Sequence, residues 1–217
     1  MFHPSHLTRR VIAKSTLRMF SLGLVSTFGL LGAGAAQSAA ATGTLVNSQA
    51  CNENPLTQPF SRWHDDSSYE LAPGGDIEGS LSGWTLAGGA ARVSGSDPFD
   101  ATGSSGSYSL SLPAGGSAQT PFTCVDAAYP TLRFFAVNSN LLGAALVQVV
   151  YKTQLGTLTV PVGAVALSGQ WQPTLTALTA SVAVALTSGG TAQMAVRVTS
   201  VTGTTKIDDI YVDPRMH

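Results

Sequence analysis

Hydrophobic and polar residues alternate along much of the chain after residue 42, a pattern typical of half-buried β-strands. Tyr108, Leu110 and Leu112 fall on one side of such a strand, and Ser107, Ser109 and Ser111 fall on the other. Similar alternating or continuous apolar runs cover 132–136, 142–151, 158–162, 182–186 and 192–198. No apolar stripe with helical spacing occurs in this part of the chain. The pattern predicts an all-β domain.

Glycine-rich turn signals separate these runs, at Pro73-Gly74-Gly75, Gly88-Gly89, Gly115-Gly116, Gly189-Gly190 and Gly203. Many short strands broken by such turns indicate an antiparallel β-sandwich or barrel. No repeat of about 20–50 residues is evident, which disfavours a propeller or a solenoid. We therefore expect one β-sandwich domain over 59–217, preceded by a polar lead-in segment at 42–58.

Residues 1–41 have the features of a cleavable signal peptide. Four basic residues and no acidic residue occur there, followed by an apolar run from Met19 to Ala36 and a stretch of small residues. This order is that of an n-region, an h-region and a cleavage zone, with the cut expected between Ser38 and Thr42. The segment from Thr8 to Lys14 also resembles a twin-arginine export motif, so both export routes fit.

The apolar run is short, and it is rich in Gly and Ala near its end, which disfavours a retained membrane anchor. We predict a secreted, extracellular protein without a stable membrane anchor after cleavage. Loss of the four basic leader residues from the eleven of the chain leaves seven against twelve acidic ones, a net charge of −5. An acidic protein of this kind does not suit a nucleic-acid or anionic-lipid partner.

Cys51 and Cys124 are the two cysteines of the chain, and both follow the leader. An even pair in an oxidising compartment predicts one disulfide. Asn47-Ser48-Gln49-Ala50 precedes Cys51 in place of the small-apolar lipobox of a lipoprotein. Two cysteines and one interior histidine make a poor set of zinc ligands. A structural disulfide is the expected role.

Short motifs near both ends of the expected domain resemble the galactose-binding-like jelly rolls, the fold of many carbohydrate-binding modules. The motifs are Gly75-Asp76-Ile77-Glu78, Gly83-Trp84, Gly169-Gln170-Trp171-Gln172-Pro173 and Ile207-Asp208-Asp209-Ile210. Their order and spacing match that family over most of 70–213, with Ile77 where the family usually has Phe. The pattern also resembles small uncharacterised secreted proteins of actinobacteria built from this one domain. The resemblance implies a jelly-roll β-sandwich.

The resemblance also implies a structural calcium ion, shared between the opening Glu and a closing Asp. Glu78 and Asp208 are the leading candidate ligands, Asp209 is the second choice and Asp76 the third. Regular alternation would place Asp208 on the face of Ile210 and Val212, towards the interior, where an unpaired charge is costly. The alternative is that these carboxylates are solvated or pair with Lys206 or Arg92.

Aromatic side chains could mark a sugar site, because sugar rings stack on flat apolar surfaces. The candidates are Trp63, Tyr69, Trp84, Tyr129, Trp171 and Tyr211. Most of these rings are expected to fill the core, as large aromatic residues usually do. Trp63 and Tyr129 are flanked by polar or turn residues, and they are the candidates for an exposed ligand site.

The sequence does not favour catalysis. His64 is followed by two acids, but no Gly-x-Ser-x-Gly elbow accompanies it. Glu70 and Glu78 are eight residues apart, which does not predict a glycosidase pair. The function expected is therefore a non-catalytic module that binds a glycan, such as a cell-wall or extracellular polysaccharide. The alternatives are a cell-envelope structural or protein-interaction protein without a sugar site, and, third, a small glycan-active enzyme.

Overall fold

The computed structural model describes residues 55–126, 131–178 and 191–213. Strands occupy most of this part of the chain, and one 3-10 helix, η1, spans Ser61–Trp63. The strands are β1 (Leu56–Thr57), β2 (Tyr69–Leu71), β3 (Thr85–Ala87), β4 (Ala91–Ser94), β5 (Tyr108–Leu112), β6 (Ser117–Gln119), β7 (Thr123–Asp126), β8 (Thr131–Asn138), β9 (Gly143–Thr153), β10 (Gly156–Leu167), β11 (Gln172–Pro173), β12 (Ala177–Leu178), β13 (Thr191–Thr202) and β14 (Thr205–Asp213).

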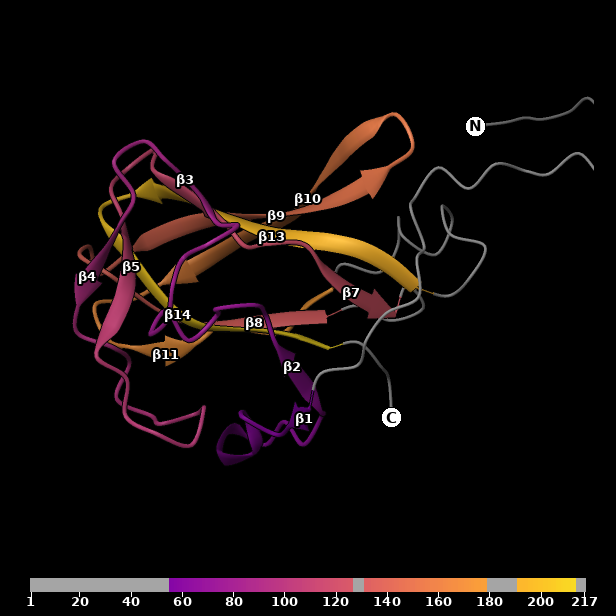
Figure 1. Cartoon of the computed structure of the whole chain (residues 1–217). Helices are drawn as coiled ribbons and strands as arrows, with labels where there is room; N and C mark the ends of the chain where they lie inside the picture. Colours follow the sequence, from indigo (N-terminus) through magenta and orange to yellow (C-terminus); the bar gives the residue numbers. More distant parts are fainter. Residues whose placement is uncertain (1–54, 127–130, 179–190, 214–217) are drawn as a thin grey trace, which may run out of the picture. The chain divides into compact units, whose positions relative to one another are not determined.

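The strands form two antiparallel sheets (Figure 1). One sheet has six strands in the order β10-β9-β13-β6-β3, with β7 also paired to β13. The other has eight strands, in which β1-β2-β14-β5-β4 form one path and β8 pairs with β14, β11 and β12. In Figure 1 the sheet of β9 and β13 lies above the sheet of β8 and β14. This arrangement confirms the expected all-β sandwich.

One hydrophobic core fills the space between the sheets. The eight-stranded sheet contributes alternate residues of β8 (Leu132, Phe134 and Ala136), and the six-stranded sheet contributes alternate residues of β9 (Val147, Val149 and Tyr151). Met194, Val196 and Val198 of β13 complete this layer. The period-two pattern in these three runs therefore predicts the core face correctly, because alternate side chains of a strand point to the same side.

A second cluster covers the opposite face of the eight-stranded sheet. Phe135 of β8 and Tyr211 of β14 alternate with residues of the inter-sheet core, and they pack with Phe60 and Tyr69. Trp63, Phe99 and Trp171 pack against this group while remaining half-buried. The eight-stranded sheet is thus buried on both faces in its centre, which explains why nearly every residue of β8 is buried.

Some strands differ from the simple alternation expected. Tyr108 and Leu158 are each 37% exposed because they lie at the beginnings of β5 and β10, away from the packed centre. Leu56 and Thr57, within the expected lead-in, form β1 against β2. In the part of the chain that the structure describes, no helix is long and apolar enough to cross a membrane.

Several sequence-based expectations fall outside the described residues. These are the signal peptide at 1–41, the apolar run at 182–186, Tyr129 and Cys51. The backbone of Cys124 lies in β7, opposite Gln193 of β13, but its side chain is outside the description. The disulfide between Cys51 and Cys124 and the cleavage of the leader stay predictions.

Candidate functional site

A β-bulge in β14 creates the first candidate site. The register of β14 against β8 shifts between Asp208 and Tyr211, and Asp209 has a positive φ of 47°. The bulge inserts one extra residue, which interrupts the alternation of side chains. Ile207 and Ile210 therefore both reach the inter-sheet core. The expectation that Asp208 shares the face of Ile210 is wrong for this reason, although Asp208 is fully buried.

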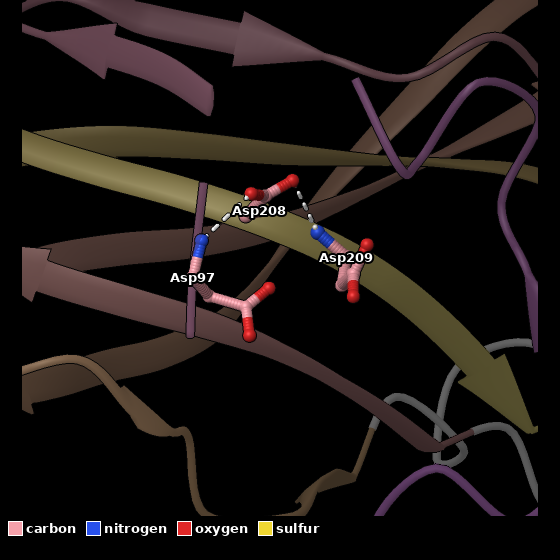
Figure 2. Close-up of side chains that lie close together, drawn as sticks. All are labelled: Asp97, Asp208 and Asp209. Atoms are coloured by element: carbon pink, nitrogen blue, oxygen red, sulfur yellow. Dashed lines mark hydrogen bonds between the residues drawn. The ribbon is translucent and has the colours of Figure 1, made fainter. Parts of the chain in front are cut away.

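Three buried carboxylates meet at this bulge, from Asp97, Asp208 and Asp209 (Figure 2). Each contributes a carboxylate oxygen, and these oxygens lie within 4.8 Å of one another. Asp208 Oδ2 accepts hydrogen bonds from Ser96 Oγ at 2.8 Å and from the Asp97 backbone N–H at 3.1 Å. Asp208 Oδ1 accepts from the Asp209 backbone N–H at 3.0 Å. Asp208 thus ties the segment before β5 to the bulge.

A small cavity of about 10 Å³ lies beside these carboxylates. That volume has room for about one water-sized sphere. Five acidic residues line it: Asp76, Glu78, Asp97, Asp100 and Asp209. None of the described residues that line it is basic. We call Asp208 together with these five residues the acidic cluster.

Glu78 anchors the long connection between β4 and β5 to the acidic cluster. Its Oε1 accepts hydrogen bonds from the backbone N–H groups of Ser107, at 2.6 Å, and Tyr108, at 2.8 Å. Asp76 Oδ1 in turn accepts a long hydrogen bond of 3.4 Å from the Glu78 N–H. The opening motif and the connection to β5 are therefore held around the same cavity.

Burial and mutual repulsion raise the pKa values of the clustered carboxyl groups. Desolvation raises the pKa of Asp208 to about 7, although the hydrogen bonds from Ser96 and Asp97 oppose the rise. Desolvation, followed by the charges of Asp97 and Asp208, raises the pKa of Asp209 to about 8. The pKa of Asp97 is also raised, mainly by desolvation. Close carboxylates cannot all ionise cheaply without a compensating positive charge.

The donor set of the acidic cluster fits a calcium ion. Calcium prefers several hard oxygen ligands and accepts flexible geometry, and carboxylates are its usual protein ligands. The sequence left open that these carboxylates pair with Arg92. Arg92 instead donates from Nη1 to the Gly79 carbonyl, and its guanidinium lies 4.6 Å from the centre of the Tyr108 ring. The ion pair between Arg133 and Asp65 involves neither Arg92 nor any residue of this cluster.

The structure brings together all four acidic residues proposed from the sequence, Asp76, Glu78, Asp208 and Asp209. Asp209 lines the cavity, whereas both oxygens of Asp208 accept hydrogen bonds from neighbouring groups. Sequence reasoning missed Asp97 and Asp100. Asp97 is 111 residues from Asp208, and the long connection between β4 and β5 that contains it carries no motif that indicates this pairing.

The second candidate site is an open cavity of about 600 Å³ next to Trp63. It is lined by Trp63, His64, Asp65, Asp66, Ser67, Arg133, Leu175 and Thr176. Trp63 ends η1, and His64 follows in a left-handed conformation with φ 62°, which turns the chain towards Asp65. We call this cavity the Trp63 pocket.

An ion pair forms one wall of the Trp63 pocket. Arg133 Nη1 lies 2.6 Å from Asp65 Oδ2, and Arg133 Nε donates to the Thr174 carbonyl at 2.9 Å. The Tyr69 hydroxyl also donates to Asp65 Oδ2, at 2.8 Å. Desolvation acts to raise the pKa of Asp65, but these hydrogen bonds outweigh it and the pKa is lowered. Asp65 is therefore a fixed carboxylate beside a guanidinium.

The other aromatic candidates are structural in the described part of the chain. Tyr69 and Tyr211 are buried in the second cluster, and Trp171 packs against it. Trp84 packs against the inter-sheet core, and its Nε1 donates to the Pro73 carbonyl at 3.2 Å. These positions match the expectation that most aromatic rings fill the core. Trp63 lines an open cavity, as a residue of an exposed ligand site must.

The residues considered for catalysis are engaged in other contacts. Asp65 bonds to Arg133, Tyr69 and Ser67, and these contacts orient it independently of the exposed His64. Glu70 is buried in β2 and accepts a hydrogen bond from Thr123 Oγ1 at 3.1 Å. Glu78 holds the backbone before β5, as described above. These contacts give each acid a structural role.

Comparisons with known proteins identify similar folds. No protein-family model matches the chain, and no curated protein matches its sequence. A structure of the Clostridium thermocellum xylanase 10B, with its CBM22-1 and GH10 modules and bound xylohexaose, is similar over 70% of this chain, with a TM-score of 0.50 and 12% identity. The match spans 29% of that longer chain.

Isolated carbohydrate-binding domains are also among the similar structures. The CBM22-2 xylan-binding domain of Paenibacillus barcinonensis Xyn10C matches 65% of this chain and 98% of its own, with a TM-score of 0.46 and 12% identity. TmCBM61 in complex with β-1,4-galactotriose matches 65% of this chain and 94% of its own, with a TM-score of 0.39 and 16% identity. The likeness to the xylanase structure, with a TM-score of 0.50 at 12% identity, shows the fold alone. The chain has the jelly-roll β-sandwich architecture that its sequence motifs indicated.

Proposed function

We propose that this protein is a secreted, non-catalytic module that binds a neutral glycan in the Trp63 pocket. The observation that carries the proposal is the combination of a half-buried tryptophan with a fixed carboxylate–guanidinium pair around one open cavity. An indole ring offers a flat apolar surface to the C–H groups of a sugar ring. Asp65 and Arg133 supply an acceptor and donors for sugar hydroxyls, with geometry fixed before binding.

The charge of the site favours a neutral ligand over an acidic one. The charges of Asp65 and Arg133 neutralise each other, and the exposed Asp66 adds a negative charge to the rim of the Trp63 pocket. The whole chain after the leader also has a net charge of −5. Like charges repel acidic polysaccharides at long range. Xylohexaose, the ligand in the similar xylanase structure, is a neutral oligosaccharide and is the first ligand to test.

We also propose that the acidic cluster binds a structural calcium ion. Asp97 and Asp209 would hold the ion, with Asp76, Glu78 and Asp100 around the same cavity. When bound, the ion would supply the positive charge that the buried carboxylates lack. The same proposal includes removal of the leader and a disulfide between Cys51 and Cys124, which an extracellular location would permit.

The test is binding of the calcium-loaded protein to insoluble xylan and a panel of other neutral polysaccharides, followed by calorimetry with the oligosaccharide of the retained class. We expect retention by at least one neutral glycan and loss of binding by roughly 2 kcal/mol or more in Trp63→Ala, as for a stacking residue at the centre of a site. Tyr108→Ala is the matched control, because Tyr108 is an exposed ring that packs on Arg92 and lies outside the Trp63 pocket. Equal binding by the two variants would contradict the assignment.

A protein-interaction role in the cell envelope is the second candidate, favoured by exposed leucines. Leu142 and Leu155 are 92% and 91% exposed, at the connections before and after β9. Isolated exposed apolar residues are common, so this observation alone is weaker than a built cavity. Failure of every neutral glycan to bind, together with capture of an envelope protein that is lost in Leu142→Ser or Leu155→Ser, would favour this role.

A further inference from the structure

The acidic cluster and the Trp63 pocket are joined by one short segment, residues 96–99, between β4 and β5. At one end of this segment, Ser96 Oγ and the Asp97 backbone N–H both donate to Asp208 Oδ2, at 2.8 and 3.1 Å. At the other end, the ring of Phe99 packs edge-on against Trp63, with 5.0 Å between ring centres. A single turn of chain thus contacts both sites.

The turn itself is rigidly defined. The Phe99 backbone N–H donates to Asp97 Oδ1 at 2.8 Å, so the carboxylate of Asp97 fixes the position of Phe99 two residues later. Hydrogen bonds of an Asp side chain to the N–H two residues on form a compact turn of defined shape. A displacement of Asp97 therefore moves Phe99 with it.

The position of Trp63 depends on Phe99. Trp63 lies on η1 outside both sheets, and its ring is held by aromatic neighbours rather than by strand pairing. Those neighbours are Phe99 at 5.0 Å, Phe135 at 5.4 Å and Phe60 at 6.5 Å between ring centres. Phe99 also packs on Phe135, at 5.2 Å, so it fills the angle between Trp63 and the sheet. The guanidinium of Arg62 lies over both Trp63 and Phe99.

We propose that a cation in the acidic cluster fixes the ring of Trp63 through Asp97 and Phe99, and so sets the glycan affinity of the Trp63 pocket. This inference rests on the proposed glycan-binding function and on the proposed calcium site. With the cation, Asp97 and Asp209 are attracted to a common positive charge, and the segment 96–99 stays on β14. Without it, the hydrogen bonds to Asp208 alone hold the segment on β14, and the contact between the rings of Phe99 and Trp63 loosens.

The test follows the three tryptophan rings by fluorine NMR on protein labelled with 5-fluorotryptophan, assigned by single Trp→Phe variants, as calcium is added to chelator-treated protein. We expect the Trp63 resonance to shift with the same midpoint as calcium binding measured by calorimetry. Glycan affinity should rise by about fivefold or more over the same range, a typical coupling between two sites.

Phe99→Leu separates this local link from a general stabilisation of the fold. Leucine keeps an apolar side chain in the gap but removes the edge-on ring, so we expect calcium to bind and the Trp63 resonance to stop responding. Tyr108→Leu is the control, because its ring contacts Arg92 while its backbone N–H still donates to Glu78. In this variant the Trp63 response should persist.

Three results would overturn the inference: calcium that does not bind, calcium that binds without shifting the Trp63 resonance, or a shift that is unchanged in Phe99→Leu. Failure of the glycan-binding function is distinguishable from these results. In that case the Trp63 resonance would follow calcium and depend on Phe99, while no glycan would bind in either condition. That result would refute both the glycan-binding function and the effect of calcium on glycan affinity. It would still support the part of the inference in which calcium fixes the Trp63 ring.

Discussion

Ile207 and Ile210 pack in the same inter-sheet core although they are three residues apart on β14. In a regular strand an odd spacing places two side chains on opposite faces. The bulge between Asp208 and Tyr211, with Asp209 at a φ of 47°, restores both isoleucines to the core. The two residues between them are then free to bring their carboxylates to Asp97. The closing motif therefore contributes two isoleucines to the core and, between them, two aspartates to the acidic cluster.

Without calcium, the stability of the protein should fall as the pH rises. Burial raises the pKa of Asp208 to about 7 and that of Asp209 to about 8, from an ordinary value of 3.8. Between the unfolded and folded pKa values the folded protein holds protons that the unfolded chain releases, so the free energy of unfolding decreases through this window. We expect a lower melting temperature in chelator at about pH 9 than at about pH 5.

Saturating calcium should remove most of this fall, because the cation replaces the protons that neutralise the cluster. The measurement is thermal unfolding followed by circular dichroism across the pH range, with and without calcium. A melting temperature in chelator that is constant or rises towards alkaline pH would show that the carboxyl groups of Asp208 and Asp209 titrate at ordinary values.

Asp209→Asn should stabilise the calcium-free protein at alkaline pH and weaken calcium binding. Asparagine tolerates the positive φ of this position as well as aspartate does, so the bulge is preserved. The substitution removes one of three buried negative charges and one charged ligand. We expect a flatter dependence of stability on pH and a calcium affinity lower by about tenfold, equivalent to roughly 1.4 kcal/mol.

The control for this substitution is Asp66→Asn, which neutralises an exposed carboxylate on the rim of the Trp63 pocket. Calorimetry with calcium and thermal unfolding in chelator give the two readouts. Unchanged calcium affinity in Asp209→Asn would exclude Asp209 as a ligand, whatever its effect on stability.

Gly75 of the opening motif should be intolerant of any side chain. A Cβ atom at this position would lie 2.7 Å from the Ile210 carbonyl oxygen and 2.9 Å from that of Ala72, and both are backbone atoms that cannot rotate away. The same glycine accepts a hydrogen bond from the Ile210 N–H at 3.1 Å, next to the bulge. Gly75→Ala should therefore lower the free energy of unfolding by about 2 kcal/mol, as overpacking does.

Gly79→Ala is the matched control, since a Cβ atom there meets nothing within 4 Å. It should change stability by less than about 0.5 kcal/mol, as surface substitutions usually do. Gly75→Ala should also weaken calcium binding, because the close approach of the opening motif to β14 places Asp76 beside the cavity. Denaturant unfolding of both variants is the measurement. Equal stabilities would contradict the close approach of Gly75 to the Ile210 and Ala72 carbonyl oxygens.

The sequence predicts the fold better than it predicts the sites, for identifiable reasons. Alternation in β8, β9 and β13 reports burial between two sheets, so Phe134, Val147 and Val196 are correctly assigned to the core. Alternation cannot show that the other face of β8 is also covered, because Phe60 and Trp63 reach Phe135 from a distant, irregular segment. The second cluster is therefore visible in the structure alone.

For the acidic cluster, too, the sequence predicts the residues that lie in recognisable motifs and misses a residue that only the fold brings close to them. Glu78 and Asp209 were accessible from the sequence because the motifs that contain them resemble those of a known fold. Asp97 comes from a connection without a recognisable motif, and only the pairing of β4, β5 and β14 brings it to Asp209. The bulge that directs Asp209 depends on a backbone angle, which a run of isoleucine and aspartate residues does not specify.

Arg133→Met should destabilise the protein and weaken glycan binding together. Arg133 pairs with Asp65, donates to the Thr174 carbonyl and lies 4.3 Å from the centre of the Phe60 ring. Methionine retains much of the apolar volume but leaves a partly buried carboxylate on the wall of an open cavity without its counter-charge, which should cost about 2 kcal/mol. The pKa of Asp65, now lowered, should rise because its largest stabilising partner is lost.

Arg197→Met is the control, because Arg197 donates two hydrogen bonds to the neutral Gln119 side chain on the six-stranded sheet. It should cost about 1 kcal/mol, the usual effect of losing a partly exposed hydrogen bond.

The double variant Asp65→Asn with Arg133→Met should be more stable than Arg133→Met alone, since the unpaired charge is then gone. Denaturant unfolding measures all three. Equal losses in the two arginine variants would show that the Asp65 pair stabilises the fold no more than a neutral contact does.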